Sequence, residues 1–129
     1  MTKKILIVDD EPNIVISLEF LMKKEGFDVA VASDGEEALA KVASFEPDLV
    51  LLDVMMPKKS GFEVCEALRA DPARAGLLVV MLTAKGRETE VAKGLAIGAD
   101  AYVTKPFSTK DLVTRVKRSE ERRVGKECL

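Results

Sequence analysis

The sequence predicts an α/β fold in which helices cover both faces of a doubly wound, five-stranded parallel sheet. Short apolar runs at 4–8, 28–32, 48–52, 77–82 and 101–104 alternate with stretches whose apolar residues follow helical spacing. The first, third and fourth runs are apolar at successive positions, which is typical of strands buried on both faces. Strict alternation of strand and helix indicates parallel pairing through right-handed crossovers.

Apolar stripes with helical spacing predict five helices between and after these strands. The stripe of the first helix is Ile14, Leu18, Leu21 and Met22, and that of the second is Ala38, Leu39, Val42 and Ala43. The stripe of the third helix is Val64, Ala67 and Leu68, and that of the fifth is Leu112, Val113 and Val116. Gly26 is expected to end the first helix, Ser33 or Asp34 to cap the second, and Ser108 or Thr109 to open the fifth. The fourth helix, about 87–97, has the thinnest stripe and is expected to be the least firmly held.

Length and composition favour one globular domain. The chain has 129 residues, of which 47% are hydrophobic and 33% charged. Its apolar runs are far shorter than the roughly 20 residues of a membrane helix, and its N-terminus does not resemble a signal peptide, so we expect a cytoplasmic protein. With two cysteines and no histidine, neither a disulfide framework nor a zinc or haem site is expected. A net charge of −2 argues against nucleic acid binding by this domain.

Polar and charged residues follow the apolar runs where each predicted strand ends. Asp9 and Asp10 follow the first run, Asp53 the third, Thr83 the fourth and Lys105 the fifth. Ligands of doubly wound sheets bind beyond the carboxyl ends of the strands. We therefore expect three carboxylates, one hydroxyl and one ammonium group to lie together in one small site at this edge of the sheet.

This combination of groups suits phosphoryl transfer assisted by Mg²⁺. Carboxylates without nearby histidine or cysteine form a hard oxygen site, and Mg²⁺ commonly bridges a carboxylate to a phosphate. Asp53 could act as the nucleophile, while Lys105 and the metal neutralise the phosphoryl oxygens and Thr83 donates a hydrogen bond. Each residue alone has an ordinary alternative: Asp10 and Thr83 as helix caps, and Lys105 as a solvated surface charge.

The chain resembles the receiver domains of two-component response regulators from Lys3 to about Lys117. The matching segments, in order, are ILIVDDE (5–11), DLVLLDVMMP (48–57) with Gly61, MLTA (81–84) and GADAYVTKPF (98–107). The resemblance implies a flavodoxin-like (βα)5 fold with strand order 2-1-3-4-5. It also implies Mg²⁺ as cofactor and a histidine kinase or phosphotransfer protein as partner.

The acidic residues take their roles from this resemblance. Asp53 matches the aspartate that a histidine kinase phosphorylates. Asp10 matches the residue that binds Mg²⁺ directly, and Asp9 the one that assists through water. Met55 matches a position whose backbone carbonyl is a metal ligand, which explains why its side chain can vary.

The resemblance also implies a switch. Thr83 matches the switch hydroxyl, Lys105 the phosphate-binding lysine, and Tyr102 the aromatic residue that turns inward when Thr83 moves to the phosphate. The peptide bond before Pro106 is cis in the family. Lys85, like Met55, matches a variable position that tunes how fast the phosphoryl group is lost.

The face of the predicted fourth helix, fifth strand and fifth helix resembles that of receivers which dimerise through charge pairs. Lys93, Asp100, Asp111 and Arg115 stand at the matching positions, whereas Ala101 replaces an acid common in that subgroup. A solvated charged surface is the alternative to a homodimer.

The last residues do not continue the apolar stripe of the fifth helix. One reverse translation of the segment from Arg118 to Cys128 resembles a common sequencing adapter, so we expect 118–129 to be a non-native tail after a receiver domain at 1–117, with an effector domain absent. A polar helix extension is the alternative.

The sequence thus predicts a phosphorylation-dependent switch that is not an enzyme toward outside substrates, although it assists its own phosphorylation and dephosphorylation. A second hypothesis is a Mg²⁺-dependent phosphohydrolase with an aspartyl nucleophile. Such enzymes carry another aspartate two residues later, where this chain has Met55. A third is a phosphate-independent interaction module, which the intact set of site residues disfavours.

Overall fold

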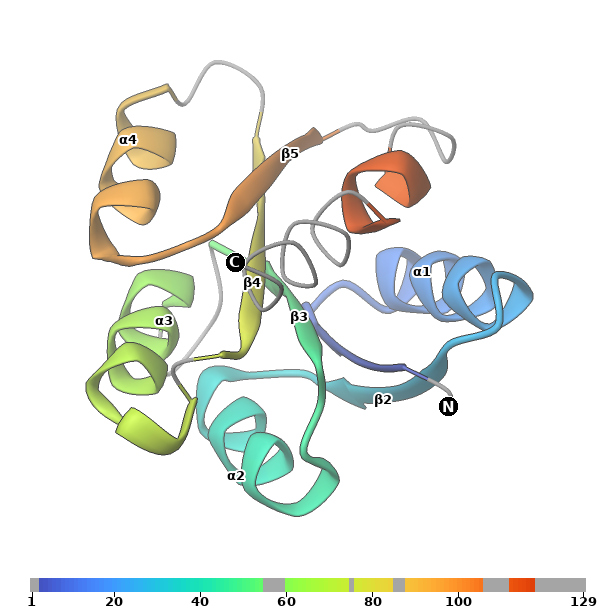
Figure 1. Ribbon diagram of the computed structural model, residues 1–129. Coiled ribbons are helices and arrows are strands. Elements are labelled where there is room, and N and C mark those ends of the chain that lie inside the picture. The colour runs from blue at the N-terminus through green and yellow to red at the C-terminus, as the bar shows by residue number, and fades with distance from the viewer. Residues whose placement is uncertain (1–2, 55–59, 75, 85–87, 106–111, 118–129) are drawn as a thin grey trace.

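The computed structural model describes residues 3–54, 60–74, 76–84, 88–105 and 112–117. Their elements follow in the order β1 (Lys4–Val8), α1 (Pro12–Lys24), β2 (Asp28–Ala32), α2 (Gly35–Phe45), β3 (Leu49–Asp53), α3 (Gly61–Ala70), a 3-10 turn (Pro72–Arg74), β4 (Leu78–Ala84), α4 (Glu88–Ile97) and β5 (Ala101–Lys105). Residues 112–117 are also helical. The strands form one parallel sheet in the order β2-β1-β3-β4-β5, which confirms the predicted fold (Figure 1).

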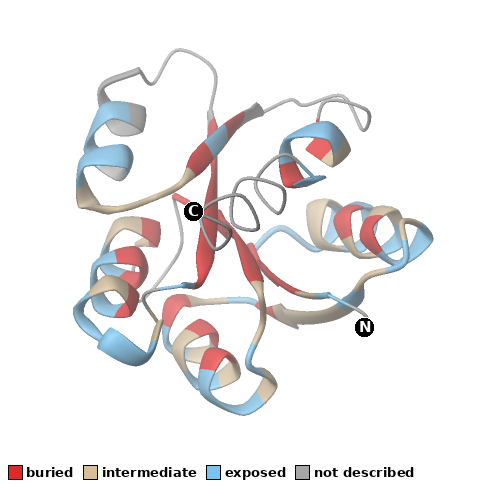
Figure 2. Ribbon diagram, in the orientation of Figure 1, coloured by how far each residue is buried: buried red, intermediate tan, exposed pale blue. Residues whose placement is uncertain are grey.

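Alternate residues of the central strands face two separate hydrophobic cores. Leu6 and Val8 of β1 pack with α2 and α3, whereas Ile5 and Ile7 pack with α1 and the helix at 112–117. Figure 1 shows these helices on opposite sides of the sheet, and Figure 2 shows the central strands as buried. Burial on both faces is the reason that the strands appear in the sequence as continuous apolar runs.

Short-range hydrogen bonds set several helix boundaries. Asp34, one of two predicted caps, accepts a hydrogen bond from the backbone N–H of Glu37 at 2.8 Å and opens α2. Ser60 and Glu63 form a reciprocal capping box at the start of α3. Gly26 follows α1 with a φ of 94°, a left-handed conformation that glycine adopts without steric cost.

The apolar stripes predicted for α2 and α3 each include one residue that is not buried. Ala43 and Ala67 are exposed, and α3 instead buries Cys65 between Val64 and Leu68. Side chains at positions i+3 and i+4 of a helix point in different directions. A helix that packs on the core through its Val and Leu side chains can therefore leave a neighbouring alanine exposed to solvent. Burial raises the pKa of the Cys65 thiol, which favours its neutral form in the core.

The predicted start of the fifth helix, at Ser108 or Thr109, lies outside the described residues. Within the described part of the chain, no helix is both long and apolar enough to span a membrane.

Arg69, at the end of α3, joins three segments through its guanidinium group. Its Nε donates to the carbonyl oxygen of Gly98 at 2.8 Å, and one terminal nitrogen donates to that of Leu77 at 2.6 Å. The other terminal nitrogen lies 2.7 Å from the Asp100 carboxylate, which also accepts the N–H of Val79 at 2.8 Å. Arg69 therefore ties α3 to the start of β4 and to the turn between α4 and β5.

We predict that Arg69→Ala lowers the free energy of unfolding by about 2–4 kcal/mol, measured by urea denaturation. The substitution leaves the half-buried Asp100 carboxylate without its cation and leaves two backbone carbonyls without a donor. Arg74→Ala is the matched control, because the Arg74 Nε lies 4.0 Å from a carboxylate oxygen of the exposed Asp71. That control should lose less than about 1 kcal/mol. Equal losses in the two variants would contradict the role of the Arg69 network.

Candidate phosphoryl-acceptor and metal site

The strand register brings the predicted site residues to one edge of the sheet. Val8, the last residue of β1, pairs with Leu52 of β3, so Asp9 follows one strand at the level where Asp53 ends the other. Asp53 in turn pairs with Leu82 of β4, directly before Thr83. Because all the strands are parallel, these carboxyl ends meet at the same edge.

Three carboxylates converge there. Asp9, Asp10 and Asp53 each offer one oxygen atom, and these oxygens all lie within 4.8 Å of one another. Asp9 and Asp53 are buried, with 1% and 5% exposure, whereas Asp10 is exposed. Carboxylate oxygens in this arrangement fit a hard divalent cation such as Mg²⁺, which takes oxygen ligands and retains several waters.

The helix-cap alternative for Asp10 does not fit the structure. The N-cap of α1 is Glu11, whose side chain makes no cap hydrogen bond, and the backbone N–H of Glu11 donates to the Asp9 carboxylate at 2.9 Å. Pro12 at the first helical position needs no hydrogen-bond acceptor for its nitrogen. Asp10 is therefore placed with the other two aspartates and is not used to begin the helix.

Thr83 carries a buried hydroxyl group without a hydrogen-bond partner among the described residues. The residue is 3% exposed and lies near the end of β4. Leaving a buried polar group unsatisfied costs about 1–3 kcal/mol. An unsatisfied hydroxyl at this edge is the kind of group that a bound or transferred anion could satisfy.

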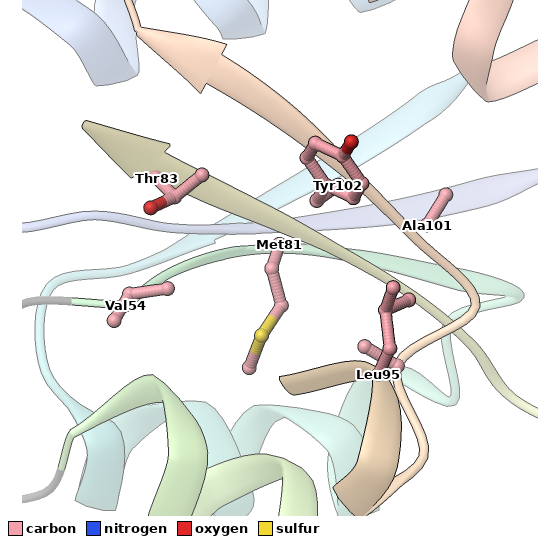
Figure 3. Close-up of a pocket in the computed structure, with 7 residues that line it drawn as sticks. Val54, Met81, Thr83, Leu95, Ala101 and Tyr102 are labelled. Atoms are coloured by element: carbon pink, nitrogen blue, oxygen red, sulfur yellow. The ribbon is translucent and has the colours of Figure 1, made fainter. Parts of the chain in front are cut away.

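A shallow, mostly apolar hollow lies beside Thr83. It is partly open to solvent, has no room for a water molecule, and is lined by Val54, Met81, Thr83, Leu95, Ala99, Ala101 and Tyr102. Tyr102 is 36% exposed, and Figure 3 shows its ring at the rim with the hydroxyl pointing away from Met81 and Leu95. Thr83 and Tyr102 thus lie on adjacent strands beside the same pocket.

Other predicted site residues are described in part or not at all. The backbone of Lys105 ends β5 beside Ala84, which places this residue at the same sheet edge. Met55, Lys85 and Pro106 lie outside the described residues, so their predicted roles stay predictions.

One residue that was predicted to be a surface charge forms hydrogen bonds and an ion pair within the chain. Asp100, expected at a dimer interface, binds Arg69 and the β4 backbone. Its partner stands 31 residues earlier on another helix, and no local pattern in the sequence indicates this pairing. Of the other expected interface residues, Lys93 lies with its ammonium 4.6 Å from the centre of the Phe62 ring, and Asp111 lies outside the described residues.

Comparisons with known proteins identify the family of this chain. Residues 5–117 match the protein family described as "Response regulator receiver domain". The chain is 50% identical over 117 residues to the DNA-binding response regulator MtrA of Mycolicibacterium smegmatis, covering 91% of this chain and 50% of that protein. It is 51% identical over 117 residues to the alkaline phosphatase synthesis transcriptional regulatory protein PhoP of Bacillus subtilis, covering 91% of this chain and 48% of that protein.

A solved structure is also similar over most of the chain. The crystal structure of a putative response regulator from Chloroflexus aurantiacus is 35% identical, with a TM-score of 0.89, and the match covers 92% of this chain and 98% of that one. The chain spans about half the length of the curated relatives it matches.

We predict that Thr83→Val raises the free energy of unfolding of the untreated protein by about 1 kcal/mol, measured by urea denaturation, because valine replaces an unsatisfied hydroxyl with a methyl group of similar size. Thr83→Ser keeps the hydroxyl and removes the methyl group, so it should lower that free energy by about 1 kcal/mol. A valine variant less stable than wild type would show that the hydroxyl has a partner in the resting protein.

Proposed function

Because the chain belongs to the response regulator receiver domain family, whose members are phosphorylation-dependent signalling switches, we propose that Asp53 is its phosphoryl acceptor. The observation that carries this proposal is the convergence of Asp53 with Asp9 and Asp10 at the carboxyl edge of the sheet. Asp53 is 5% exposed, so its carboxylate is largely enclosed by the surrounding protein at this edge. In the reaction, a carboxylate oxygen attacks the phosphorus, and the bond from phosphorus to its donor breaks.

Asp9 and Asp10 would hold Mg²⁺ together with Asp53 and the Met55 carbonyl. The ion would supply positive charge that offsets the three carboxylates and the transferred phosphoryl oxygens. Lys105, whose backbone ends β5 at this edge, would add a second positive charge. The same groups would assist hydrolysis of the acyl phosphate, so the domain catalyses only its own phosphorylation and dephosphorylation.

Thr83 would report the phosphorylated state. A phosphoryl group on Asp53 brings acceptor oxygens to the sheet edge, and the Thr83 hydroxyl can then donate the hydrogen bond that it lacks in the described structure. Because this contact exists only after phosphorylation, it shifts the population between two states. Movement of Thr83 would open the adjacent pocket to the Tyr102 ring, which would change the exposed surface of α4 and β5.

A histidine kinase or phosphotransfer protein would dock over α1. The donor must place its phosphoryl group beside Asp53, so it must cover the elements that border this sheet edge. Helix α1 begins there and exposes two apolar side chains one turn apart, Ile16 at 65% and Phe20 at 70%. Large exposed apolar side chains next to a reactive site favour a protein partner.

The switched face would act on a DNA-binding effector. One curated relative is named a DNA-binding response regulator and the other a transcriptional regulatory protein, and this chain spans about half of each. Homodimerisation through α4, β5 and the helix at 112–117 is a further proposal, although Asp100, one of the charged residues expected at that interface, is bound by Arg69 within the chain. The segment 118–129 lies outside the described residues, and its origin as a non-native tail is tested by resequencing the gene.

The acceptor is tested by incubating the chain with Mg²⁺ and acetyl phosphate, followed by intact-protein mass spectrometry. We predict one phosphoryl adduct per chain that is absent in Asp53→Asn and absent without Mg²⁺. An adduct of equal yield in Asp53→Asn would contradict the assignment. Rapid turnover of added phosphate esters would instead indicate a hydrolase, and no adduct in wild type would indicate a phosphate-independent module.

The same two proteins test the oligomer when they are treated with Mg²⁺ and beryllofluoride in place of acetyl phosphate. Treated wild type is compared with treated Asp53→Asn by sedimentation velocity. A dimer that forms only in treated wild type would support the homodimer, and a monomer at high concentration would exclude it.

The kinase surface is tested with the source organism's histidine kinase that phosphorylates wild type fastest. We predict that Phe20→Ser slows transfer from that kinase by roughly tenfold or more, because central apolar anchors dominate binding energy. The rate with acetyl phosphate should not change. Ala43→Ser near the end of α2, which also replaces an exposed apolar side chain, is the control and should leave kinase transfer unchanged. Equal slowing with acetyl phosphate would mean that Phe20→Ser damages the site and not the docking.

A further inference from the structure

Helix α3 begins in direct contact with the peptide that follows the acceptor. A Cβ atom placed on Gly61 would collide with the carbonyl oxygen of Asp53, and it would lie 2.8 Å from the Cα of Val54 and 3.0 Å from the Asp53 carbonyl carbon. All three atoms belong to the backbone, so no side chain can rotate away. Gly61 is not among the residues with positive φ, so the glycine is required for space and not for its backbone conformation.

The contact is held from both sides. The N–H of Gly61 donates to the carbonyl of Val54 at 2.9 Å, and the N–H of Val54 donates to the carbonyl of Leu82 at 3.1 Å. The backbone of Val54 is therefore fixed between β4, through its N–H, and the first turn of α3, through its carbonyl group.

We propose that Gly61 is a positioning residue of the phosphoryl-acceptor site, because its missing side chain lets α3 seat against the Asp53–Val54 peptide and set the place of the Asp53 carboxylate. This inference rests on the proposed function of Asp53. Any larger residue at 61 must displace α3 or the end of β3. The oxygens of the three aspartates lie within 4.8 Å of one another, and Mg²⁺ demands near-ideal octahedral geometry, so a small displacement should weaken binding.

The test uses Gly61→Ala in the full chain, with Mg²⁺ affinity measured by calorimetry and the rate of phosphorylation by acetyl phosphate. We expect both to fall by about tenfold or more, since small misplacements of reacting groups have large effects on rate. Helix propensity alone would favour alanine over glycine within α3, so it predicts no such loss. Wild-type affinity and rate in Gly61→Ala would overturn the proposal.

Ser60→Ala is the matched control. It removes the cap of the same helix turn without adding an atom beside Asp53, so it should lower the thermal unfolding midpoint while leaving Mg²⁺ affinity unchanged. If Ser60→Ala weakens Mg²⁺ binding as much as Gly61→Ala, the effect belongs to helix stability and the proposal fails.

A measurement on wild type decides the matter if Gly61→Ala does not fold. In a chain labelled with ¹⁵N-glycine, the Gly61 amide should shift on addition of Mg²⁺, because it is hydrogen-bonded to Val54, whereas Gly26 at the far end of α1 should not. A Gly61 amide that stays in place while Mg²⁺ binds would overturn the proposal.

The two proposals can fail separately. If wild type binds Mg²⁺ but Asp53 is not phosphorylated, the proposed function fails, and the Mg²⁺ affinities still decide the role of Gly61. If wild type neither binds Mg²⁺ nor accepts phosphate, both fail.

Discussion

Mutual repulsion among three carboxylates is the constraint around which this domain is built. Parallel pairing of β1 with β3 brings Asp9 and Asp53 to the same buried edge, and Asp10 completes a group whose oxygens lie within 4.8 Å of one another. Two unit charges 4.8 Å apart repel by about 3.5 kcal/mol at an effective dielectric constant of about 20, and by less for the exposed Asp10, which water screens. The hydrophobic sheet holds these groups together, because β1 and β3 are packed on both faces. The site that a cation or a transferred phosphoryl group would occupy is therefore already assembled by packing.

Besides the closeness of the three carboxylates, the described structure contains a second unfavourable feature. Thr83 is buried with no hydrogen-bond partner among the described residues, and the pocket next to it is mostly apolar. The Thr83 hydroxyl without a partner within the residues that the structure describes and the partly exposed Tyr102 ring are both less favourable than a fully packed arrangement. Both become reasonable if the protein has two states, with the hydroxyl satisfied in one and the Tyr102 ring exposed in the other. The cost borne by the resting state is then part of what makes the phosphorylated state accessible.

Helix α3 contacts both the proposed acceptor, Asp53, and the surface expected to change. Its first residue, Gly61, lies against the backbone of Asp53, and Arg69 near its other end holds Gly98 and Asp100. The turn between α4 and β5 is thereby anchored to the same helix that borders the site. This arrangement favours movement at the start of α4 and at Tyr102 over displacement of α4 as a whole.

Sequence alone determined the strands, the helices and the groups at the strand ends, because parallel sheets buried on both faces produce uninterrupted apolar runs followed by polar residues. The placement of Asp9, Asp10 and Asp53 together followed from that pattern. Local periodicity could not decide which side of a stripe would be buried, and Ala43 and Ala67 proved to be exposed while Cys65 is in the core. Tertiary structure alone decided that Asp100 pairs with Arg69, that the Thr83 hydroxyl has no hydrogen-bond partner within the described part of the chain, and that Gly61 is needed for space. Each of these depends on contacts between segments distant in the chain, and such contacts leave no periodic signal in the residues that make them.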